Sequence, residues 1–207
     1  MTELMKTVSE RLTQRGFEVF HAHTRSEAHD TLLSLIAPGQ SVGIGGSVSI
    51  RELDILDALT AQDSRVSWHW LADSPEAGNT AKENARTSDV YLASANAVTA
   101  DGRIVNIDGM GNRVAAMFQG PKTVILAVGA QKLVSGGLDE AIGRIRRIAC
   151  PANAKRLGLQ TPCGLAGKCN PLACNNDIAM CRVITVLEHP SNGRRVIVLL
   201  CDEEIGY

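Results

Sequence analysis

The stretch NAVTADGRIVNIDGMGNRVAAMFQGP, residues Asn96–Pro121, places polar side chains and glycines between apolar runs. The pair Asp101-Gly102 is flanked by Val98 and by the run Ile104–Ile107. An Asp-Gly pair between two apolar runs is a strong signal for a β-hairpin. We therefore expect two antiparallel strands joined by a tight turn in the first half of this stretch.

The second half of the stretch carries the groups best suited to bind a ligand. Asp108 and Arg113 have opposite charges and can orient each other. The other polar or flexible positions are Asn106, Gly109, Gly111 and Asn112. The amides both donate and accept hydrogen bonds, and the glycines indicate backbone in left-handed or crowded conformations. The alternative is a hairpin whose polar groups serve only its own turns, and residue chemistry alone leaves both interpretations open.

Outward from this stretch, apolar runs alternate with helical periodicities along most of the chain. We expect strands over residues 17–20, 41–44, 66–70, 89–94 and 123–128, and helices over residues 4–15, 24–37, 75–87 and 138–148. Two further strands, over residues 182–187 and 195–201, are expected to form a hairpin. This alternation predicts an α/β fold, with a doubly wound, largely parallel sheet and inserted β-hairpins. The length suits one sizeable core, so we expect a single domain over residues 1–207.

The composition argues against several classes of protein. Hydrophobic residues make up 44% of the chain and aromatic residues only 3%, so the core must consist of aliphatic side chains, which favours buried parallel strands. The formal net charge is -1 and no basic stripe is visible, which argues against nucleic-acid binding. The densest basic cluster, Arg144, Arg146 and Arg147, falls on a predicted helix, where we expect a solvated face.

The apolar runs are also too short for a membrane span, which needs ~18 residues. Residues 1–15 carry charges throughout and have no apolar core, so we expect no signal peptide and a cytoplasmic location. In that reducing compartment, the six cysteines are better explained as thiols, metal ligands or catalytic groups than as disulfides.

A glycine loop follows one of the predicted strands. The run Ser41–Ile44 leads directly into Gly45-Gly46-Ser47 and then into a predicted helix. Backbone N–H groups at such a turn can hold an anion, and glycines let a ligand approach the backbone closely. In open α/β sheets ligands bind beyond the carboxyl ends of the strands, where this turn should lie. The alternative is a tight turn in which Ser47 only caps the helix.

Three motifs together resemble the LUD (lactate-utilisation) domain family, that of the LutC/YkgG-like proteins. They are Asn-Ala-Val-Thr-x-Asp-Gly from Asn96, Val-Asn-Ile-Asp-Gly-x-Gly-Asn-Arg-Val from Val105 and Gly-Pro-Lys-x-Val-Ile from Gly120, and the resemblance covers residues 5–205. It implies a fold similar to the 5-formyltetrahydrofolate cyclo-ligase, ribose-5-phosphate isomerase and CoA-transferase group, whose ligands lie beside the first glycine loop and the acidic hairpin loop. By that resemblance the ligand-binding positions are Gly45, Gly46, Ser47, Asp101, Asn106, Asp108, Asn112, Arg113 and Lys132.

The resemblance also implies a function. A LUD protein is expected to bind a small anionic ligand and to contribute to the oxidation of a hydroxy acid, above all L-lactate to pyruvate, with iron-sulfur oxidoreductase subunits as partners. One alternative is a non-catalytic scaffold or regulatory subunit of such a complex, and another is a transferase or ligase on a phosphorylated or CoA-type ligand. The sequence has no HExxH motif and no nucleophile elbow, so we assign no catalytic residue.

The chain also has a Cys-rich loop segment over residues 150–181. Its four candidate metal ligands are Cys163, Cys169, Cys174 and Cys181. Soft thiolates this close in sequence suit an iron-sulfur cluster or zinc, and the LUD resemblance favours the cluster. Several LUD proteins have a similar segment, but their Cys-x2-Cys pair is replaced here by a longer spacing. The alternative is free thiols without a metal, and for Cys150 and Cys201 we expect a place in the core.

Three histidines complete the set of candidate groups. His21 and His23 would share a face of a strand, as a metal pair might, although surface histidines are the more common outcome. His69 lies between Trp68 and Trp70, and the sequence leaves open whether it faces a ligand or the core.

Overall fold

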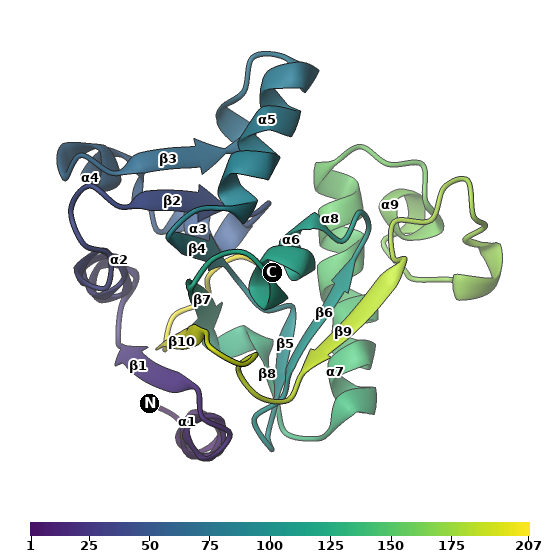
Figure 1. Ribbon diagram of the computed structural model, residues 1–207. Helices are drawn as coiled ribbons and strands as arrows, with labels where there is room; N and C mark the ends of the chain where they lie inside the picture. Colours follow the sequence, from purple (N-terminus) through teal and green to yellow (C-terminus); the bar gives the residue numbers. More distant parts are fainter.

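The computed structural model describes residues 1–207, and its centre is a six-stranded sheet in which all neighbouring strands are parallel (Figure 1). The strand order is β1-β10-β7-β4-β2-β3. The strands are β1 (Glu18–Ala22), β2 (Ser41–Ile44), β3 (Arg65–Trp68), β4 (Val90–Ala93), β7 (Thr123–Gly129) and β10 (Arg195–Cys201). Because all six run the same way, their carboxyl ends meet at one edge of the sheet.

Helices cover both faces of this sheet. The helices before β7 are α1 (Glu3–Gln14), α2 (Arg25–Ser34), α3 (Val48–Glu52), α4 (Leu56–Ala61), α5 (Pro75–Arg86) and α6 (Asn112–Phe118). Successive side chains of β7 point to opposite faces. Leu126 lies in one core with Leu12 of α1 and Met117 of α6, whereas Ile125 lies in a second core with Leu32 of α2. The predicted doubly wound α/β fold is therefore confirmed.

Two helices begin at a capping hydroxyl group. The Thr24 hydroxyl accepts a hydrogen bond from the backbone N–H of Glu27, and Ser74 caps α5 in the same way. The Glu27 carboxylate accepts from the N–H of His23 at 2.7 Å, one residue before the cap. This bond fixes the chain between β1 and α2.

A second, mixed sheet has the strand order β8-β5-β6-β9, in which only the β8–β5 pair is parallel. Its strands are β5 (Ala97–Thr99), β6 (Ile104–Asp108), β8 (Leu133–Val134) and β9 (Val183–Leu187). β5 and β6 are antiparallel, with Val98 opposite Ile104, so the hairpin predicted around Asp101-Gly102 is confirmed. Val98 and Ile104 share a buried core with Leu126, so the two sheets pack together.

The predicted hairpin of residues 182–187 and 195–201 is wrong. β9 pairs antiparallel with β6 in the small sheet, whereas β10 lies parallel between β1 and β7 in the large one. The burial of the two strands explains this difference. β10 is buried along residues 196–201, which suits the centre of a parallel sheet, and β9 is exposed at its start.

A long helical segment follows β8. Helix α7 (Leu138–Arg144) continues through a π-helical turn (Ile145–Ala149) into α8 (Cys150–Arg156), so the predicted helix end at Ile148 is wrong. Pro151 has no N–H to donate and its ring crowds the preceding turn, which the wider π turn accommodates. The remaining short elements are α9 (Pro162–Ala166) and 3-10 turns over His69–Leu71, Ala130–Lys132 and Pro171–Ala173. None of the helices combines the length and apolarity needed to cross a bilayer.

Candidate functional site

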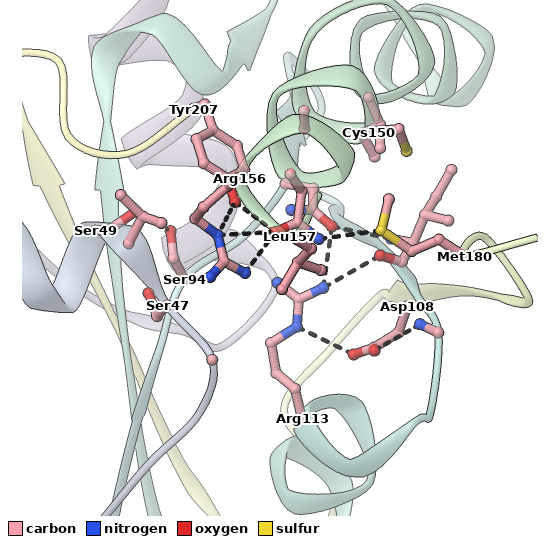
Figure 2. Close-up of a pocket in the computed structure, with 18 of the residues that line it drawn as sticks. Ser47, Ser49, Ser94, Asp108, Arg113, Cys150, Arg156, Leu157, Met180 and Tyr207 are labelled. Carbon is pink, nitrogen blue, oxygen red and sulfur yellow. Dashed lines mark hydrogen bonds and ion pairs between the residues drawn. The ribbon is translucent and has the colours of Figure 1, made fainter. Parts of the chain in front are cut away.

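A cavity of about 320 Å³ lies beyond the carboxyl ends of β2, β4 and β7, between the large sheet and helix α8 (Figure 2). From the sheet side it is lined by Gly46, Ser47, Ser49, Ser94 and Lys132. From the opposite side it is lined by Asp108, Asn112, Arg113, Cys150, Asn153, Arg156, Met180, Cys181 and Tyr207. The cavity thus lies where ligands bind in open α/β sheets.

The glycine loop after β2 has two different glycines. Gly45 is buried, and a Cβ there would lie 2.7 Å from the Tyr91 hydroxyl, so only glycine fits the packing. Gly46 is exposed to the cavity, and a Cβ there would meet its nearest neighbour, the His69 ring, at an ordinary 3.5 Å. Ser47 both lines the cavity and caps α3, accepting a hydrogen bond from the N–H of Ile50 at 3.3 Å. The helix cap at Ser47 is therefore confirmed, and its place in the cavity wall is compatible with the predicted ligand-binding role.

Lys132 is a buried amine at the base of the cavity. Its side chain follows β7 in a 3-10 turn, is 2% exposed, and donates hydrogen bonds to Ser49 Oγ at 2.6 Å and Ser94 Oγ at 3.0 Å. Burial, followed by the positive charges of Arg144 and Arg113, lowers the pKa of Lys132 to about 7. An amine with this pKa both accepts and releases a proton near neutral pH.

Arg113 is the fixed cation on the opposite wall. Its Nε donates to the Asp108 carboxylate at 3.1 Å, and its Nη2 donates to Asn96 Oδ1 at 3.1 Å and to the Ile107 carbonyl at 3.2 Å. Nη1 has no hydrogen bond to the protein, so a donor of the guanidinium is available to a ligand. The mutual orientation predicted for Asp108 and Arg113 is confirmed.

The loop between β6 and α6 depends on its two glycines. Gly111 has φ +82°, a left-handed conformation, and it is the residue that precedes α6. A Cβ at Gly109 would lie 2.9 Å from the Met180 carbonyl oxygen, so this backbone approach also requires glycine. These features confirm the predicted left-handed and crowded backbone.

Arg144 does not lie on a solvated face, which corrects the expectation for the basic cluster. It is 4% exposed, its Nη1 donates to the Asn96 carbonyl at 2.6 Å, and its Nε donates to the Gln131 carbonyl at 2.8 Å. Arg146 and Arg147 are exposed as expected. The buried guanidinium joins the start of β5 to the turn that carries Lys132, and its charge helps to lower the pKa of Lys132.

Three predicted ligand-binding residues do not line this cavity: Gly45, which packs against Tyr91, and the two polar residues Asp101 and Asn106. Asp101 lies in the β5–β6 turn and forms ion pairs with Arg103 at 2.8 Å and Arg15 at 3.6 Å. Asn106 is 2% exposed, and its side-chain oxygen accepts from the backbone N–H of Asn96 at 3.0 Å. Both side chains therefore hold the hairpin in place, and neither reaches the cavity.

The structure also adds cavity residues that were not predicted. Tyr207 Oη donates to Asn153 Oδ1 at 2.6 Å, and Arg156 donates to Tyr207 Oη at 3.1 Å and stacks over Trp70 at 4.9 Å from the ring centroid. His69 lines the cavity, which answers the question that the sequence left open. Burial, Lys82 and Arg156 lower the pKa of His69. In the sequence, only the i, i+3 spacing of Asn153 and Arg156 could have indicated that these two side chains lie on one face of a helix and line the cavity together.

The cysteines of residues 150–181 form a group beside the cavity. The Sγ atoms of Cys150 and Cys181 share a hydrogen bond at 3.2 Å, and both residues line the cavity. Burial, and then the nearby thiols Cys163, Cys181 and Cys174, raise the pKa of Cys169. The hydrogen bond shared with Cys150 and the charge of Arg146 lower the pKa of Cys181 to about 7 despite its partial burial.

Two cysteines were expected to be core residues. Cys201 lies in the core of the large sheet, as expected. Cys150 is buried too, but it also belongs to the thiol group, which corrects the expectation that it is only a core residue.

This group of thiols can be compared with the two metal centres that were considered. A tetrahedral zinc ion with Zn–S bonds of ~2.3 Å needs sulfurs roughly 3.8 Å apart. No three of these cysteines have all their sulfurs within 4.8 Å of one another. An iron-sulfur cluster spreads its ligands over several iron atoms and therefore tolerates wider spacing. No three of these sulfurs are therefore spaced for a single tetrahedral zinc ion, and an all-thiol donor set is also the kind that holds iron-sulfur clusters.

The fold and the site define a doubly wound α/β protein with a polar cavity at the carboxyl edge of its parallel sheet. Residues 5–200 match the LUD domain model, and the chain belongs to the LUD domain family, which is associated with lactate utilisation. A crystal structure of a DUF162 family protein from Deinococcus radiodurans has a similar fold, with a TM-score of 0.54 over 96% of both chains and 15% sequence identity. No curated protein matches the chain.

Proposed function

We propose that this LUD protein binds a small 2-hydroxy acid in the cavity and contributes to its oxidation, with L-lactate to pyruvate as the first reaction to test. One observation carries the proposal. The cavity that holds Arg113 and Lys132 is also lined by Cys150 and Cys181 of the thiol group. A cation, a proton acceptor and candidate ligands of a redox centre therefore face one small space.

Arg113 suits the carboxylate of a 2-hydroxy acid, and Lys132 suits its hydroxyl group. The free Nη1 of Arg113 is placed to donate to the carboxylate of the substrate, and charge-assisted hydrogen bonds of this kind are the strong ones. Lys132, with a pKa of about 7, is neutral in part of the molecules and accepts the proton of the substrate hydroxyl. Ser49 and Ser94 hold the amine in place through their hydroxyls.

Oxidation of a 2-hydroxy acid to a 2-oxo acid breaks the O–H and the C2–H bonds and releases two electrons and two protons. Lys132 accepts the hydroxyl proton, the C2 hydrogen leaves as a proton to solvent, and both electrons pass to the oxidoreductase subunit that serves as the oxidant. Cys163, Cys169, Cys174 and Cys181 would hold an iron-sulfur cluster, with Cys150 beside them. When bound, such a cluster accepts electrons one at a time and passes them on. The final acceptor in this proposal is an iron-sulfur oxidoreductase subunit that docks near the thiol group.

The test uses protein purified without oxygen. Iron and acid-labile sulfide are measured together with visible and electron paramagnetic resonance spectra, and L-lactate binding is measured by calorimetry. We expect several irons per chain and saturable lactate binding. A colourless protein that contains no iron and has four freely titrating thiols in residues 163–181 would exclude the cluster. Absence of binding by any small carboxylate would exclude the substrate assignment.

A non-catalytic scaffold is the second candidate, and the exposure of the Cys-rich segment favours it. Leu172 is fully exposed at 100% and Leu165 is 68% exposed, both beside the thiol group. Large apolar side chains in contact with solvent on one segment are typical of a protein-binding surface. If this candidate is right, the chain forms a complex with iron-sulfur subunits and no carboxylate, phosphate, nucleotide or CoA ester raises its melting temperature.

A further inference from the structure

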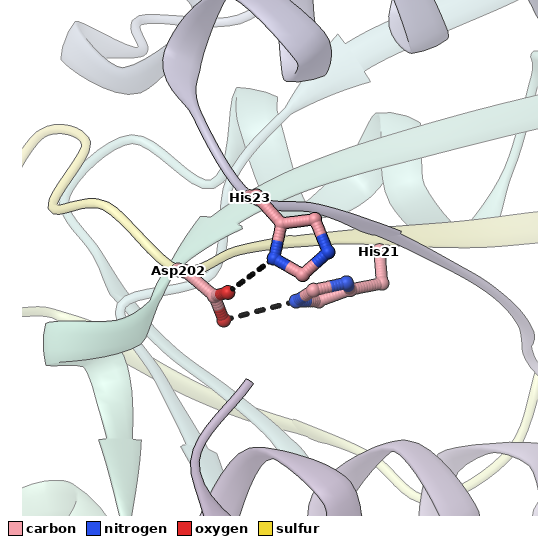
Figure 3. Close-up of side chains that lie close together, drawn as sticks. All are labelled: His21, His23 and Asp202. Atoms are coloured by element: carbon pink, nitrogen blue, oxygen red, sulfur yellow. Dashed lines mark hydrogen bonds and ion pairs between the residues drawn. The ribbon is translucent and has the colours of Figure 1, made fainter.

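A second group of polar side chains lies at the carboxyl edge of the large sheet, and none of its members lines the cavity (Figure 3). His21 belongs to β1, His23 follows β1, and Asp202 follows β10. His21 Nε2 and His23 Nδ1 each lie 2.9 Å from a different oxygen of the Asp202 carboxylate. No other group of three or more His, Cys, Asp or Glu side chains has its ligand atoms all within 4.8 Å of one another.

The backbone holds these side chains in a fixed arrangement. β1 and β10 are parallel neighbours, with Ala22 opposite Cys201, and the N–H of Asp202 donates to the Ala22 carbonyl at 3.0 Å. His21 lies near the end of the strand and His23 lies just beyond it, and Figure 3 shows both side chains turned toward Asp202. Their rings meet edge to face with centroids 4.6 Å apart, and both point at the carboxylate. The ligand atoms are therefore assembled before any ion arrives.

We propose that His21, His23 and Asp202 bind a divalent transition-metal ion of the zinc type. Two imidazole nitrogens and one carboxylate oxygen are the donors that suit such ions, whereas Mg²⁺ and Ca²⁺ prefer oxygen alone. Bonds of ~2.0–2.2 Å in a tetrahedral site place the ligand atoms roughly 3.4 Å apart, which the observed group reaches with small side-chain rotations. The ion takes over the positions that the two His–Asp hydrogen bonds now occupy.

The proposed site is open on one side. The His23 side chain is 65% exposed, so an ion bound there has at least one position free for water or an exogenous ligand. The N-terminal amine of Met1 also lies 2.9 Å from the Asp202 carboxylate, and it competes with the ion for that oxygen. These features favour an exchangeable ion over a permanently buried one.

The site is connected to the cavity through the last six residues. Residues 202–207 begin at Asp202 and end with Tyr207, which lines the cavity. Within this segment, the Ile205 carbonyl accepts from Ser49 Oγ at 3.3 Å. A Cβ at Gly206 would lie 2.4 Å from Ser49 Oγ, so the segment packs directly over the Lys132–Ser49 pair. An ion on Asp202 anchors the start of the segment that covers this pair.

The experiment titrates metal-free full-length protein with Co²⁺ and follows its visible and near-ultraviolet absorption. The cysteines also bind Co²⁺, but they produce thiolate-to-metal charge-transfer bands that a site of two histidines and an aspartate lacks. We expect one Co²⁺ ion per chain to bind without producing these charge-transfer bands. His23→Ala and Asp202→Asn should each lower the Co²⁺ affinity of this site at least about 100-fold. Even substitution of a residue that only hydrogen-bonds to a metal ligand lowers metal affinity about 10–100-fold.

The matched control is His189→Ala, which removes an exposed histidine in another loop and should leave the affinity unchanged. A second measurement follows the melting temperature with Zn²⁺, which should rise more in the wild type and in His189→Ala than in Asp202→Asn, where only the cysteines remain to bind the ion. Circular dichroism shows whether each variant is folded. The proposal would be overturned if His23→Ala bound Co²⁺ as tightly as the wild type, or if every bound Co²⁺ ion produced thiolate bands. Equally tight binding of Mg²⁺ would overturn it as well.

Discussion

Lys132 Nζ lies 2.6 Å from Ser49 Oγ, and both side chains are 2% exposed. The amine has a second hydroxyl partner, Ser94, but it forms no ion pair with a carboxylate. Burial without a counter-ion favours the neutral form of an amine, and two nearby guanidinium groups add to this preference. The cavity therefore contains a lysine whose pKa, about 7, lies near neutral pH.

This pKa predicts how stability depends on pH. In the folded chain the pKa of Lys132 is about 7, against the ordinary 10.5, so between these values the unfolded chain binds the extra proton. The contribution of Lys132 to the free energy of unfolding should then rise with pH across that window, by up to about 1.4 kcal/mol per pH unit. Lys132→Met should remove this rise. Urea unfolding of both proteins from about pH 6 to about pH 9.5 measures the difference, and parallel curves would contradict the lowered pKa.

Loss of the guanidinium should weaken carboxylate binding. Arg113→Gln removes a charged donor from the cavity wall, and hydrogen bonds to charged groups contribute about 1.5–3 kcal/mol, so we expect the Kd for L-lactate to rise at least about tenfold. Arg113→Lys keeps the positive charge but loses the planar guanidinium with its paired donors. Its Kd for L-lactate should therefore lie between those of the wild type and of Arg113→Gln. Calorimetry measures each Kd. Arg86→Gln, at an exposed arginine outside the main cavity, is the control, and unchanged affinity in Arg113→Gln would exclude this role for Arg113.

The two glycines after β2 should respond differently to substitution. Gly46→Leu adds a side chain that extends into the cavity, because its Cβ has only ordinary contacts, so binding of any anion should be lost while the melting temperature changes little. Gly45→Ala places a Cβ 2.7 Å from the Tyr91 hydroxyl and should lower the melting temperature. Thermal unfolding with and without ligand separates the two effects. Retained affinity in Gly46→Leu would show that the ligand lies elsewhere.

Asp101 is expected to affect stability alone. Its carboxylate is 46% exposed and pairs with Arg103 and Arg15, so Asp101→Asn should cost less than about 1 kcal/mol. Ligand affinity should not change, since Asp101 does not line the cavity. Chemical denaturation and calorimetry on the same preparation measure both quantities. A large loss of affinity would instead support the role that the family resemblance implies for this residue.

The local parts of the fold were predictable from the sequence, and the pairing of distant strands was not. Alternating strands and helices, the Asp101-Gly102 hairpin and the cap at Thr24 all depend on residues close in the chain. The placement of β9 and β10 in different sheets depends on partners far away in sequence. A turn-forming run such as Pro190–Gly193 is compatible with a hairpin and with a crossing between sheets, so it misled the prediction.

The site was predictable to a similar extent. Six of the nine predicted ligand-binding residues line the cavity, namely Gly46, Ser47, Asp108, Asn112, Arg113 and Lys132. Ser94 and Tyr207 were missed because a serine after a strand and a tyrosine near the end of a chain carry no local signal. Arg144 was misplaced because a buried arginine bonded to carbonyl groups has the same sequence pattern as a solvated one.

The position of β10 has a consequence for how the chain reaches its native state. β1, near the start of the chain, is an edge strand whose one neighbour is β10, near the end. During synthesis β1 has no strand to pair with until residues 195–201 have left the ribosome, whereas β2, β3, β4 and β7 can associate earlier. Such long-range pairing slows folding and leaves an unpaired strand exposed to aggregation. Shortening the chain before β10 should therefore release β1 as well, and with it the His21–His23–Asp202 group.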